Sequence, residues 1–554
     1  MDNYPYNLGP HTYPITANRS AQIWFDRGLQ WTFGFNHDEA VRCFKRAAEA
    51  DPDAAMAHWG VAYATGPNYN LPWDLWDDAG RAKALLRARE ATEAALERAD
   101  GVSEAEAALI HALPARFPQA NCASLEDMAR WDDAFATVMR DVQRQYPGNR
   151  EIRAVAVEAM MQRTPWAMWD LASGKPATGA DTEICRALLE AAFTEDPEAM
   201  THPGLLHLYV HLMEMSPTPE VALPHADRLR DLVPDAGHLV HMPTHIDVQC
   251  GAYHDVVYWN TRAVEADMLY FEREGAFNVY TGYRQHNLHF IAYGAMFLGQ
   301  FEPALAALRS IKDTTPEDML RIESPPMADF FESYLSFEPH LLVRFGMWEA
   351  CLKLETPDDP VLYATVNANT LYAKGVALAA LGRAKEARAM QSNFLAAAAA
   401  VPPTRWLHTN LVVDILEIAK AMLEGEILYR EGEFDAAFDM LRHAVALEDG
   451  LNYDEPWGWM QPVRHALGAL LLEQGHVEEA EACFRADLGL SRQLPRATMH
   501  PDNIWALRGL CDCLLARRAT EELALFQQRL SIAEARADRP VKAACGCAAA
   551  AMEA

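Results

Sequence analysis

Apolar side chains recur along most of the chain with the spacing of α-helices. They stand at i, i+3, i+4 and i+7 over successive segments, and Gly or Pro interrupts the pattern every 12–18 residues or so. The strict alternation of apolar and polar residues that is typical of strands is nearly absent. The pattern therefore predicts an all-α protein built from many short amphipathic helices.

A longer period lies on top of the helical one. Gly28, Ala40, Phe44, Ala47 and Pro52 have the spacing of the tetratricopeptide repeat, whose unit is two helices in about 34 residues. In this pattern the small residues let the two helices approach closely, the aromatic ring fills the groove between them, and Pro ends the second helix. Weaker copies include Gly251, Gly299, Gly375, Gly425 and Gly468. We therefore predict a tetratricopeptide-repeat-like α-solenoid of antiparallel helical hairpins.

Three segments rich in Pro, Asn or Trp interrupt the period, at residues 66–80, 165–182 and 314–340. Loops that interrupt a regular scaffold often carry function. The prolines of 314–340 also suggest a boundary. We predict an N-terminal array at 1–313, a Pro-rich connection at 314–340 and a C-terminal array at 341–554 that ends in a Cys-containing tail.

Histidines are concentrated in one part of the predicted N-terminal array. Seven of the 20 lie between residues 202 and 245. His207 and His211 are four residues apart, so one helix face carries both, and Glu214 extends that face. Two histidines at this spacing, taken alone, are more often core or surface residues than a pair of metal ligands. Here, however, three further histidines follow within one hairpin length. Neutral imidazoles suit Zn, Cu, Fe and Ni. The predicted metal ligands are His207, His211, His238, His241 and His245.

Other polar residues complete the predicted site. Glu214, His286 and His289 are the candidate catalytic residues, Glu214 as a carboxylate ligand or general base and the two histidines as groups that orient substrate or transfer protons. The candidate substrate-binding residues are Asn68, Asn70, Tyr69, Trp73 and Tyr209. For the two asparagines a purely structural role, in Asx-turns that shape the 66–80 loop, is an equal alternative.

Composition excludes several classes of function. The chain has 554 residues, with 48 Lys+Arg against 78 Asp+Glu and a formal charge of −30. This acidity argues against binding nucleic acid or anionic lipid. No run of about 18 apolar residues is present, so no membrane span is expected. Nucleotide-binding glycine motifs and the HExxH zinc-protease motif are absent, and we expect no nucleotide cofactor.

The ten cysteines are scattered, and the first residues lack the basic and apolar regions of a signal peptide. This usage predicts a cytoplasmic protein with reduced thiols. Two close pairs, Cys511/Cys513 and Cys545/Cys547, fit either the repeat pattern or a soft-metal or redox role.

Several phrases of the sequence resemble a known family. They are Gly34-Phe-Asn-His-Asp-Glu-Ala with Gly66-Pro-Asn-Tyr-Asn, His207-Leu-Tyr-Val-His211, Ala236-Gly-His238-Leu-Val-His241-Met-Pro-Thr-His245, and His286-Asn-Leu-His289. In these phrases the chain is similar to a family of large bacterial tetratricopeptide-repeat proteins, and the likeness covers most of its length. The resemblance implies the helical-repeat fold and a bacterial origin, and it leaves the activity undefined.

Two kinds of function remain. The first is a metal-dependent enzyme that acts on a small-molecule substrate. A nitrogen-rich ligand set favours a copper- or iron-dependent oxidoreductase, with a zinc-type hydrolase or hydratase as the alternative. The second is a non-catalytic scaffold that binds a protein partner, or a second copy of the chain, through its repeat faces. We favour the enzyme, because the repeat pattern itself does not require the histidines.

Overall fold

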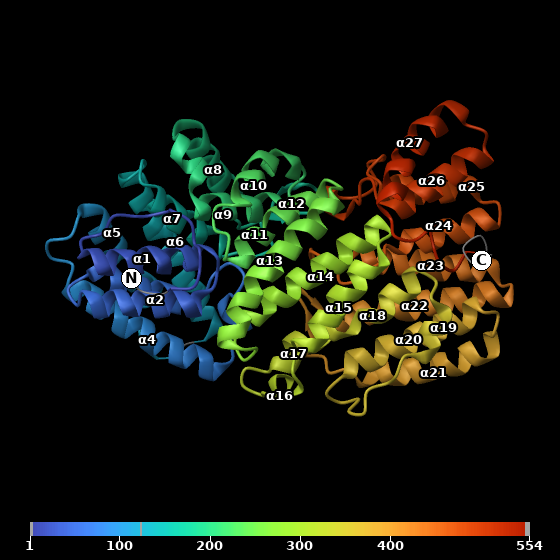
Figure 1. The fold of residues 1–554 in the computed structure, drawn as a ribbon, viewed down its shortest axis with the longest axis horizontal. Helices are drawn as coiled ribbons and strands as arrows, with labels where there is room; N and C mark the ends of the chain where they lie inside the picture. The colour runs from blue at the N-terminus through green and yellow to red at the C-terminus, as the bar shows by residue number, and fades with distance from the viewer. Residues whose placement is uncertain (1–3, 122–123, 549–554) are drawn as a thin grey trace. The chain divides into compact units, whose positions relative to one another are not determined.

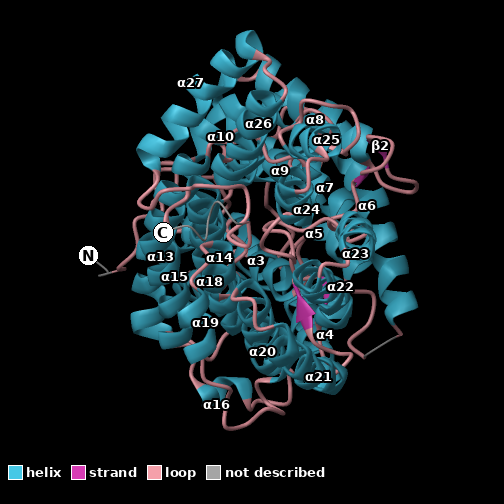
Figure 2. Cartoon of the chain, turned by 90° about the vertical axis from the view of Figure 1, so that its right-hand side faces the viewer, coloured by secondary structure: helices cyan, strands magenta, loops and turns pink. Residues whose placement is uncertain are grey.

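Helices make up nearly all the regular structure of this computed structural model, which describes residues 4–121 and 124–548 (Figure 2). Among these residues the only strands are two short antiparallel pairs. These are β1 (Trp169–Asp170) with β2 (Lys175–Pro176), and β3 (Trp406–Leu407) with β4 (Asn410–Leu411). The all-α prediction is confirmed.

The chain folds into two compact units. One comprises residues 1–246 and 262–273, and the other comprises residues 247–261 and 274–554. The first unit holds α1 (Arg19–Phe33), α2 (His37–Ala50), α3 (Ala55–Thr65), η1 (Trp73–Leu75), α4 (Asp78–Glu97), α5 (Glu104–Arg116), α6 (Leu125–Gln145), α7 (Arg150–Met161), α8 (Thr182–Glu195), η2 (Pro197–Thr201), α9 (Pro203–Met213), η3 (Pro219–Ala222), α10 (Leu223–Leu229) and α11 (Gly237–His241). Parts of α12 (Pro243–Gln249) and α13 (Tyr253–Glu274) belong to each unit.

The first predicted repeat forms a helical hairpin. The side chain of Asn18 caps α1, and that of Asn36 caps α2, because each amide oxygen accepts a hydrogen bond from a backbone N–H of the first turn. Phe44 of α2 lies in the groove against both neighbouring helices. A Cβ added at Gly28 of α1 would lie 2.6 Å from its ring, and one added at Gly60 of α3 would lie 2.4 Å away. The small residues therefore make room for the aromatic ring, as the repeat pattern predicts.

The second unit is likewise built from helices. Its elements are α14 (Thr281–Leu298), α15 (Phe301–Asp313), α16 (Glu317–Leu320), α17 (Met327–Phe331), η4 (Glu332–Ser336), α18 (Glu338–Arg344), α19 (Trp348–Lys353), α20 (Ala364–Ala380), α21 (Ala384–Ala400), α22 (Val412–Glu431), α23 (Phe434–Asp449), α24 (Val463–Glu473), α25 (Val477–Asp487), η5 (Arg496–Thr498), α26 (Ile504–Ala516) and α27 (Thr520–Arg536).

Consecutive helices of this unit pair as hairpins: α20 with α21, α22 with α23, α24 with α25, and α26 with α27 (Figure 1). Phe484 of α25 fills a groove as Phe44 does, since a Cβ at Gly468 or Gly509 would lie 2.6 or 2.3 Å from its ring. Gly432 ends α22 with φ 86°, in the left-handed region that glycine adopts without strain. The chain is therefore a tetratricopeptide-repeat-like helical protein.

The three interruptions of the period form local structure. Residues 66–80 make a turn and the short η1, and residues 165–182 include the β1–β2 pair. The stretch 314–340, predicted as a connection, lies inside the second unit and includes α16, α17 and η4.

The cysteine pairs differ from one another. Cys511 and Cys513 are buried free thiols on α26, whereas Cys545 and Cys547 are joined in a disulfide. The expectation that the thiols are reduced is therefore wrong for this last pair, whose Cα atoms lie 5.3 Å apart in the bent tail and so are within disulfide reach. Over the described ranges, no helix is both long and apolar enough to cross a membrane.

Candidate metal centre

Helix α9 supplies the first two histidines of the site and is buried along its whole length. Pro203 occupies its first turn, where the missing N–H costs nothing, and His202 caps it. His207 and His211 follow one turn apart on one face. Gly204 lets α9 approach α1 closely, because a Cβ at this position would lie 2.5 Å from the ring of Phe33. The close packing places the end of α1 beside the two histidines.

The ring of His207 is held by the last carbonyl of α1. His207 Nδ1 lies 2.6 Å from the Phe33 carbonyl oxygen, so Nδ1 carries the proton and donates it. A terminal carbonyl is available for this bond because no later turn of its own helix uses it. The lone pair therefore resides on Nε2, which is buried and has no hydrogen-bond partner within the described parts of the chain.

His211 is held in the same tautomer by a carboxylate. Its Nδ1 lies 3.1 Å from Glu214 Oε1, and its Nε2 is likewise buried without a hydrogen-bond partner in the described residues. Glu214 is itself buried. Burial raises its pKa, but the adjacent His245 and His211 more than offset this, and the net pKa lies below the ordinary value. Glu214 is thus a carboxylate that accepts from both rings, with its Oε2 2.6 Å from His245 Nδ1.

The third histidine comes from α11. His207, His211 and His238 each place one ring nitrogen within 4.8 Å of the others, and all three are buried. Burial lowers the pKa of all three rings, and their mutual repulsion when charged lowers the pKa of His207 and His238 further. The rings are therefore neutral near pH 7, the form in which imidazole binds metals.

Two more predicted ligands lie beside this group. His241 Nε2 and His245 Nε2 are 2.7 Å apart. Because His245 Nδ1 faces the Glu214 carboxylate, it is the donor there, and His245 Nε2 presents a lone pair toward His241. This contact suits a hydrogen bond from His241, or a cation shared by the two rings.

Residues of the 66–80 loop also reach the histidines. Asn70 Nδ2 lies 3.5 Å from His238 Nε2, and the ring of Tyr69 packs on His211 with centroids 4.8 Å apart. Asn68 shapes the turn instead, because its Oδ1 accepts from the backbone N–H groups of Asn70 and Leu71. Trp73 packs against Trp76.

Tyr209 does not share the histidine face of α9. Its hydroxyl donates to Glu190 Oε1 at 3.0 Å, and its ring contacts Phe193 and His225. A residue between positions i and i+4 of a helix points to another side, which explains the separation. The structure therefore gives Tyr209 a packing environment apart from the other candidate substrate-binding residues.

The predicted catalytic histidines lie on α14 of the second unit. His286 Nδ1 is 3.4 Å from His408 Nε2, and His289 packs flat on Phe337 with centroids 4.1 Å apart. His289 Nε2 also lies 2.8 Å from the Met460 sulfur. Their catalytic role stays a prediction.

One residue that shapes the site, Phe35, was not among the predicted site residues. Phe35 has φ 55°, in the left-handed region, and its ring contacts His207, His211 and His238 with centroids 4.5, 5.9 and 5.6 Å away. In the sequence it stands in a run of aromatics that predicts only helix packing. The Gly34–Phe35 turn after α1 was the available signal.

A second cluster, formed by His11, His202 and Glu151, lies in the same unit. His11 Nε2 and His202 Nε2 lie 3.2 and 3.5 Å from Glu151 Oε1. His202 Nδ1 accepts from the Leu205 N–H, so the proton of this neutral ring sits on Nε2 and points to Glu151. A metal at that nitrogen would have to displace the proton, so His202 is less suited to bind a metal than His207 or His211.

No family model matches the chain, and no curated protein matches it. One similar solved structure is that of Naa15/Naa10 bound to HypK-THB, with 14% identity and a TM-score of 0.21 over 93% of this chain; the chain spans 65% of that protein, less than two thirds of its length. Another is yeast Tom70, with 12% identity and a TM-score of 0.29 over 92% of this chain and 99% of that one.

Proposed function

We propose that this helical-repeat protein binds a transition-metal ion through His207, His211 and His238. The observation that carries the proposal is the pair of buried rings on α9, each with Nδ1 engaged by an acceptor and Nε2 left without a partner in the described residues. Metal-binding histidines have this arrangement, because the acceptor fixes the tautomer and makes the ligating nitrogen more basic. His241, His245 and Glu214 would serve as further ligands or hold the first three in place.

We further propose that the metal serves chemistry on a small molecule. Three neutral imidazoles leave coordination positions for water or substrate, and a nitrogen-rich set suits copper or iron redox chemistry as well as a zinc-bound hydroxide. Asn70 and Tyr69, which contact the histidines, would line the substrate side. Copper or iron would make the protein an oxidoreductase, and zinc would make it a hydrolase or hydratase.

The test is elemental analysis of untagged protein purified without chelators. We expect about one transition-metal ion per chain, lost in His207→Ala and in His211→Ala. His254→Ala is the matched control, because the His254 side chain is 57% exposed and belongs to another helix. Electron paramagnetic resonance then separates copper or iron from zinc. Wild-type protein that binds no copper, iron or zinc on reconstitution would exclude the proposal.

An exposed apolar face of helix α27 supports a second candidate function, that of a scaffold for protein–protein interaction. Helix α27 exposes Leu525 and Ile532, which are 66% and 57% accessible and lie two turns apart on one face. Exposed apolar side chains that share one helix face are suited to contact a protein partner or a second copy of the chain. Light scattering of the wild type and of the double variant Leu525→Lys, Ile532→Lys tests the second-copy form, for which only the wild type would dimerise.

A further inference from the structure

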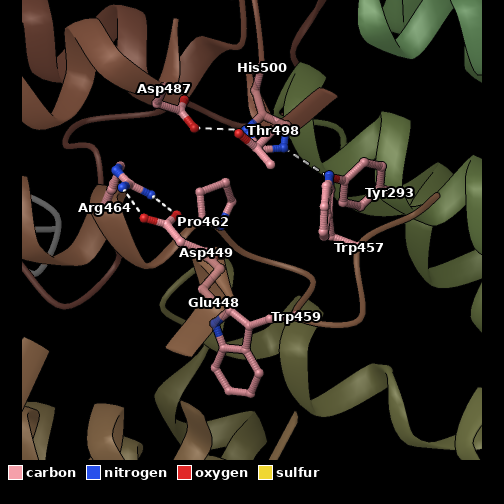
Figure 3. A pocket seen from close by; sticks show the side chains of 10 residues that line it. All are labelled: Tyr293, Glu448, Asp449, Trp457, Trp459, Pro462, Arg464, Asp487, Thr498 and His500. Atoms are coloured by element: carbon pink, nitrogen blue, oxygen red, sulfur yellow. Dashed lines mark hydrogen bonds and ion pairs between the residues drawn. The ribbon is translucent and has the colours of Figure 1, made fainter. Parts of the chain in front are cut away.

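The second unit contains a pocket that the proposed metal chemistry does not use. Its walls come from α14, α23, α24, α25, η5 and the loop before α24. Figure 3 shows the side chains that line it. The lining residues are Tyr293, Glu448, Asp449, Trp457, Trp459, Pro462, Arg464, Asp487, Thr498 and His500. Three carboxyl groups therefore face one guanidinium group, so the charge of the lining is acidic.

The guanidinium group is already engaged. Arg464 donates through both terminal nitrogens to the two oxygens of Asp449, each at 2.6 Å. This bidentate pair satisfies Asp449 and holds Arg464 against it. It leaves Glu448 and Asp487 as the other carboxyl groups of the lining.

At the other end of the pocket, a chain of hydrogen bonds determines which side-chain atoms donate and which accept. His500 Nδ1 donates to Asp487 Oδ1 at 2.8 Å, so His500 Nε2 is the acceptor for the Tyr293 hydroxyl at 3.1 Å. His465 Nε2 donates to the other oxygen of Asp487 at 2.7 Å. Because the proton of Tyr293 points to His500, its oxygen presents lone pairs to other donors.

The remaining donors of the lining are also used, with one exception. Trp457 Nε1 donates to the Ala497 carbonyl at 3.3 Å, and Thr498 Oγ1 donates to the Pro495 carbonyl at 2.9 Å. The exception is Trp459, whose Nε1–H is buried without a partner in the described residues although the side chain is only 2% exposed. A buried N–H of this kind needs an acceptor, which an ordered water or a bound ligand can supply.

We propose that this pocket binds a small organic ammonium compound that also carries an oxygen acceptor. The ammonium group would donate to Glu448 and to the Tyr293 oxygen, where acceptors outnumber free donors. The indole rings of Trp457 and Trp459 favour a cation by their electron-rich faces. The oxygen of the ligand would accept from Trp459 Nε1.

Glu448 makes binding dependent on pH. Its two oxygens lie 3.3 and 3.0 Å from the Val463 N–H. Protein atoms crowd the carboxyl, and this burial raises its pKa to about 8; Asp449 and Asp487 also raise it, while Arg464 and the Val463 N–H lower it. The other polar groups that face this end of the pocket, Tyr293 and His500, are bound to each other. An ammonium ion requires ionised Glu448, so affinity should rise as the pH rises toward 8 and binding should release a proton.

The experiment is calorimetric titration of the full chain with ethanolamine at pH 6.5 and 8.5. With one ionisation near 8, we expect roughly 20-fold tighter binding at the higher pH. Ethylene glycol, which has the same size but no charge, should not bind. Equal binding of the two compounds, or no binding of ethanolamine at pH 8.5, would overturn the proposal.

Two variants test whether Glu448 is responsible for the affinity and for its pH dependence. Glu448→Gln should weaken ethanolamine binding at pH 8.5 by about tenfold or more and remove its pH dependence. Glu433→Gln, at the exposed start of the same helix α23, should change neither. Should the Glu448 variant fail to fold, wild-type protein is titrated at pH 7 in MOPS and in phosphate, two buffers with different heats of ionisation. The two binding heats must then differ by the heat of close to one released proton per amine. Identical heats would contradict the role of Glu448.

Discussion

Buried histidines of the first unit differ in whether the hydrogen-bond partner of Nδ1 is an acceptor or a donor. His207 and His211 donate from Nδ1 to Phe33 and Glu214, which leaves Nε2 as a lone pair. His202 accepts at Nδ1 from a backbone N–H, which leaves the proton on Nε2. The same residue type is thus suited to a metal in one case and to a structural hydrogen bond in the other, because the neighbour fixes the tautomer.

At this scale we predict that Glu214→Gln weakens metal binding without abolishing it. The amide keeps the shape of the side chain but removes the charge that holds His211 and His245 and makes their nitrogens more basic. Metal affinity should fall by about 10–100-fold, measured by competition with a chromophoric chelator. Unchanged affinity would mean that Glu214 does not support the ligands, and His254→Ala provides the unaffected reference.

A second residue-scale prediction concerns Glu151. Its burial raises the pKa, but the hydrogen bonds from His11 and His202 outweigh this and lower it from 4.5 to about 2. A depressed folded-state pKa stabilises the protein above the unfolded value, and this stability is lost as the pH falls from about 5 toward 2. Glu151→Gln should therefore reduce the free energy of unfolding at pH 7 by up to about 3 kcal/mol. Urea unfolding at pH 7 and pH 4 measures the free energy of unfolding of both proteins. The difference in this free energy between the variant and the wild type should be smaller at pH 4.

At the scale of elements, glycine and phenylalanine set how closely the helices pack. Phe44 fills the space left by Gly28 and Gly60, and Phe484 fills that left by Gly468 and Gly509. The same arrangement in both units explains why the spacing of small and aromatic residues predicts the hairpins. Helices of this length gain most of their stability from such packing and less from intrinsic propensity.

We predict that Gly60→Ala destabilises the protein by about 1–3 kcal/mol, because the new methyl group would overlap the ring of Phe44. Gly148→Ala is the matched control in the same unit, since nothing lies within 4 Å of the added Cβ there. This control should change the stability by about 0.5 kcal/mol or less. Chemical denaturation of the two variants checks the prediction, and equal stabilities would show that the groove relaxes without cost.

In the whole molecule, the two candidate binding sites belong to different units. The histidine cluster on α9 and α11 belongs to the first unit, and the acidic pocket belongs to the second. Residues 247–261 of the second unit stand in the sequence between two segments of the first. The unit boundaries therefore do not follow a single cut in the chain. The division into an N-terminal and a C-terminal array joined by residues 314–340 stays a prediction.

We predict two thermal transitions in calorimetry, only one of which responds to metal. A ligand stabilises the unit that binds it, by about 2.7 kcal/mol at 100 times its dissociation constant. Removing the metal with a chelator should lower one transition and leave the other in place. Glu448→Gln should not alter the metal-sensitive transition. A single transition that moves as a whole would show that the units unfold together.

The helical class and the hairpin repeat could be predicted from the sequence, because both depend on contacts within about 34 residues of the chain. The concentration of histidines is visible in the sequence directly. The i, i+4 spacing of His207 and His211 was enough to put both on one face of α9. Local periodicity records such short-range geometry directly.

The sequence could not predict which imidazole nitrogens have no hydrogen-bond partner or which groups orient the rings, because both depend on long-range packing. The Phe33 carbonyl that orients His207 lies 174 residues away in the chain, and Asn70 lies 168 residues from His238. The Tyr293–His500 contact, which spans 207 residues, likewise involves a histidine that looks isolated in the sequence. Long-range contacts of this kind depend on how whole helices pack, and a polar residue carries no mark in the sequence of the distant group that it will meet.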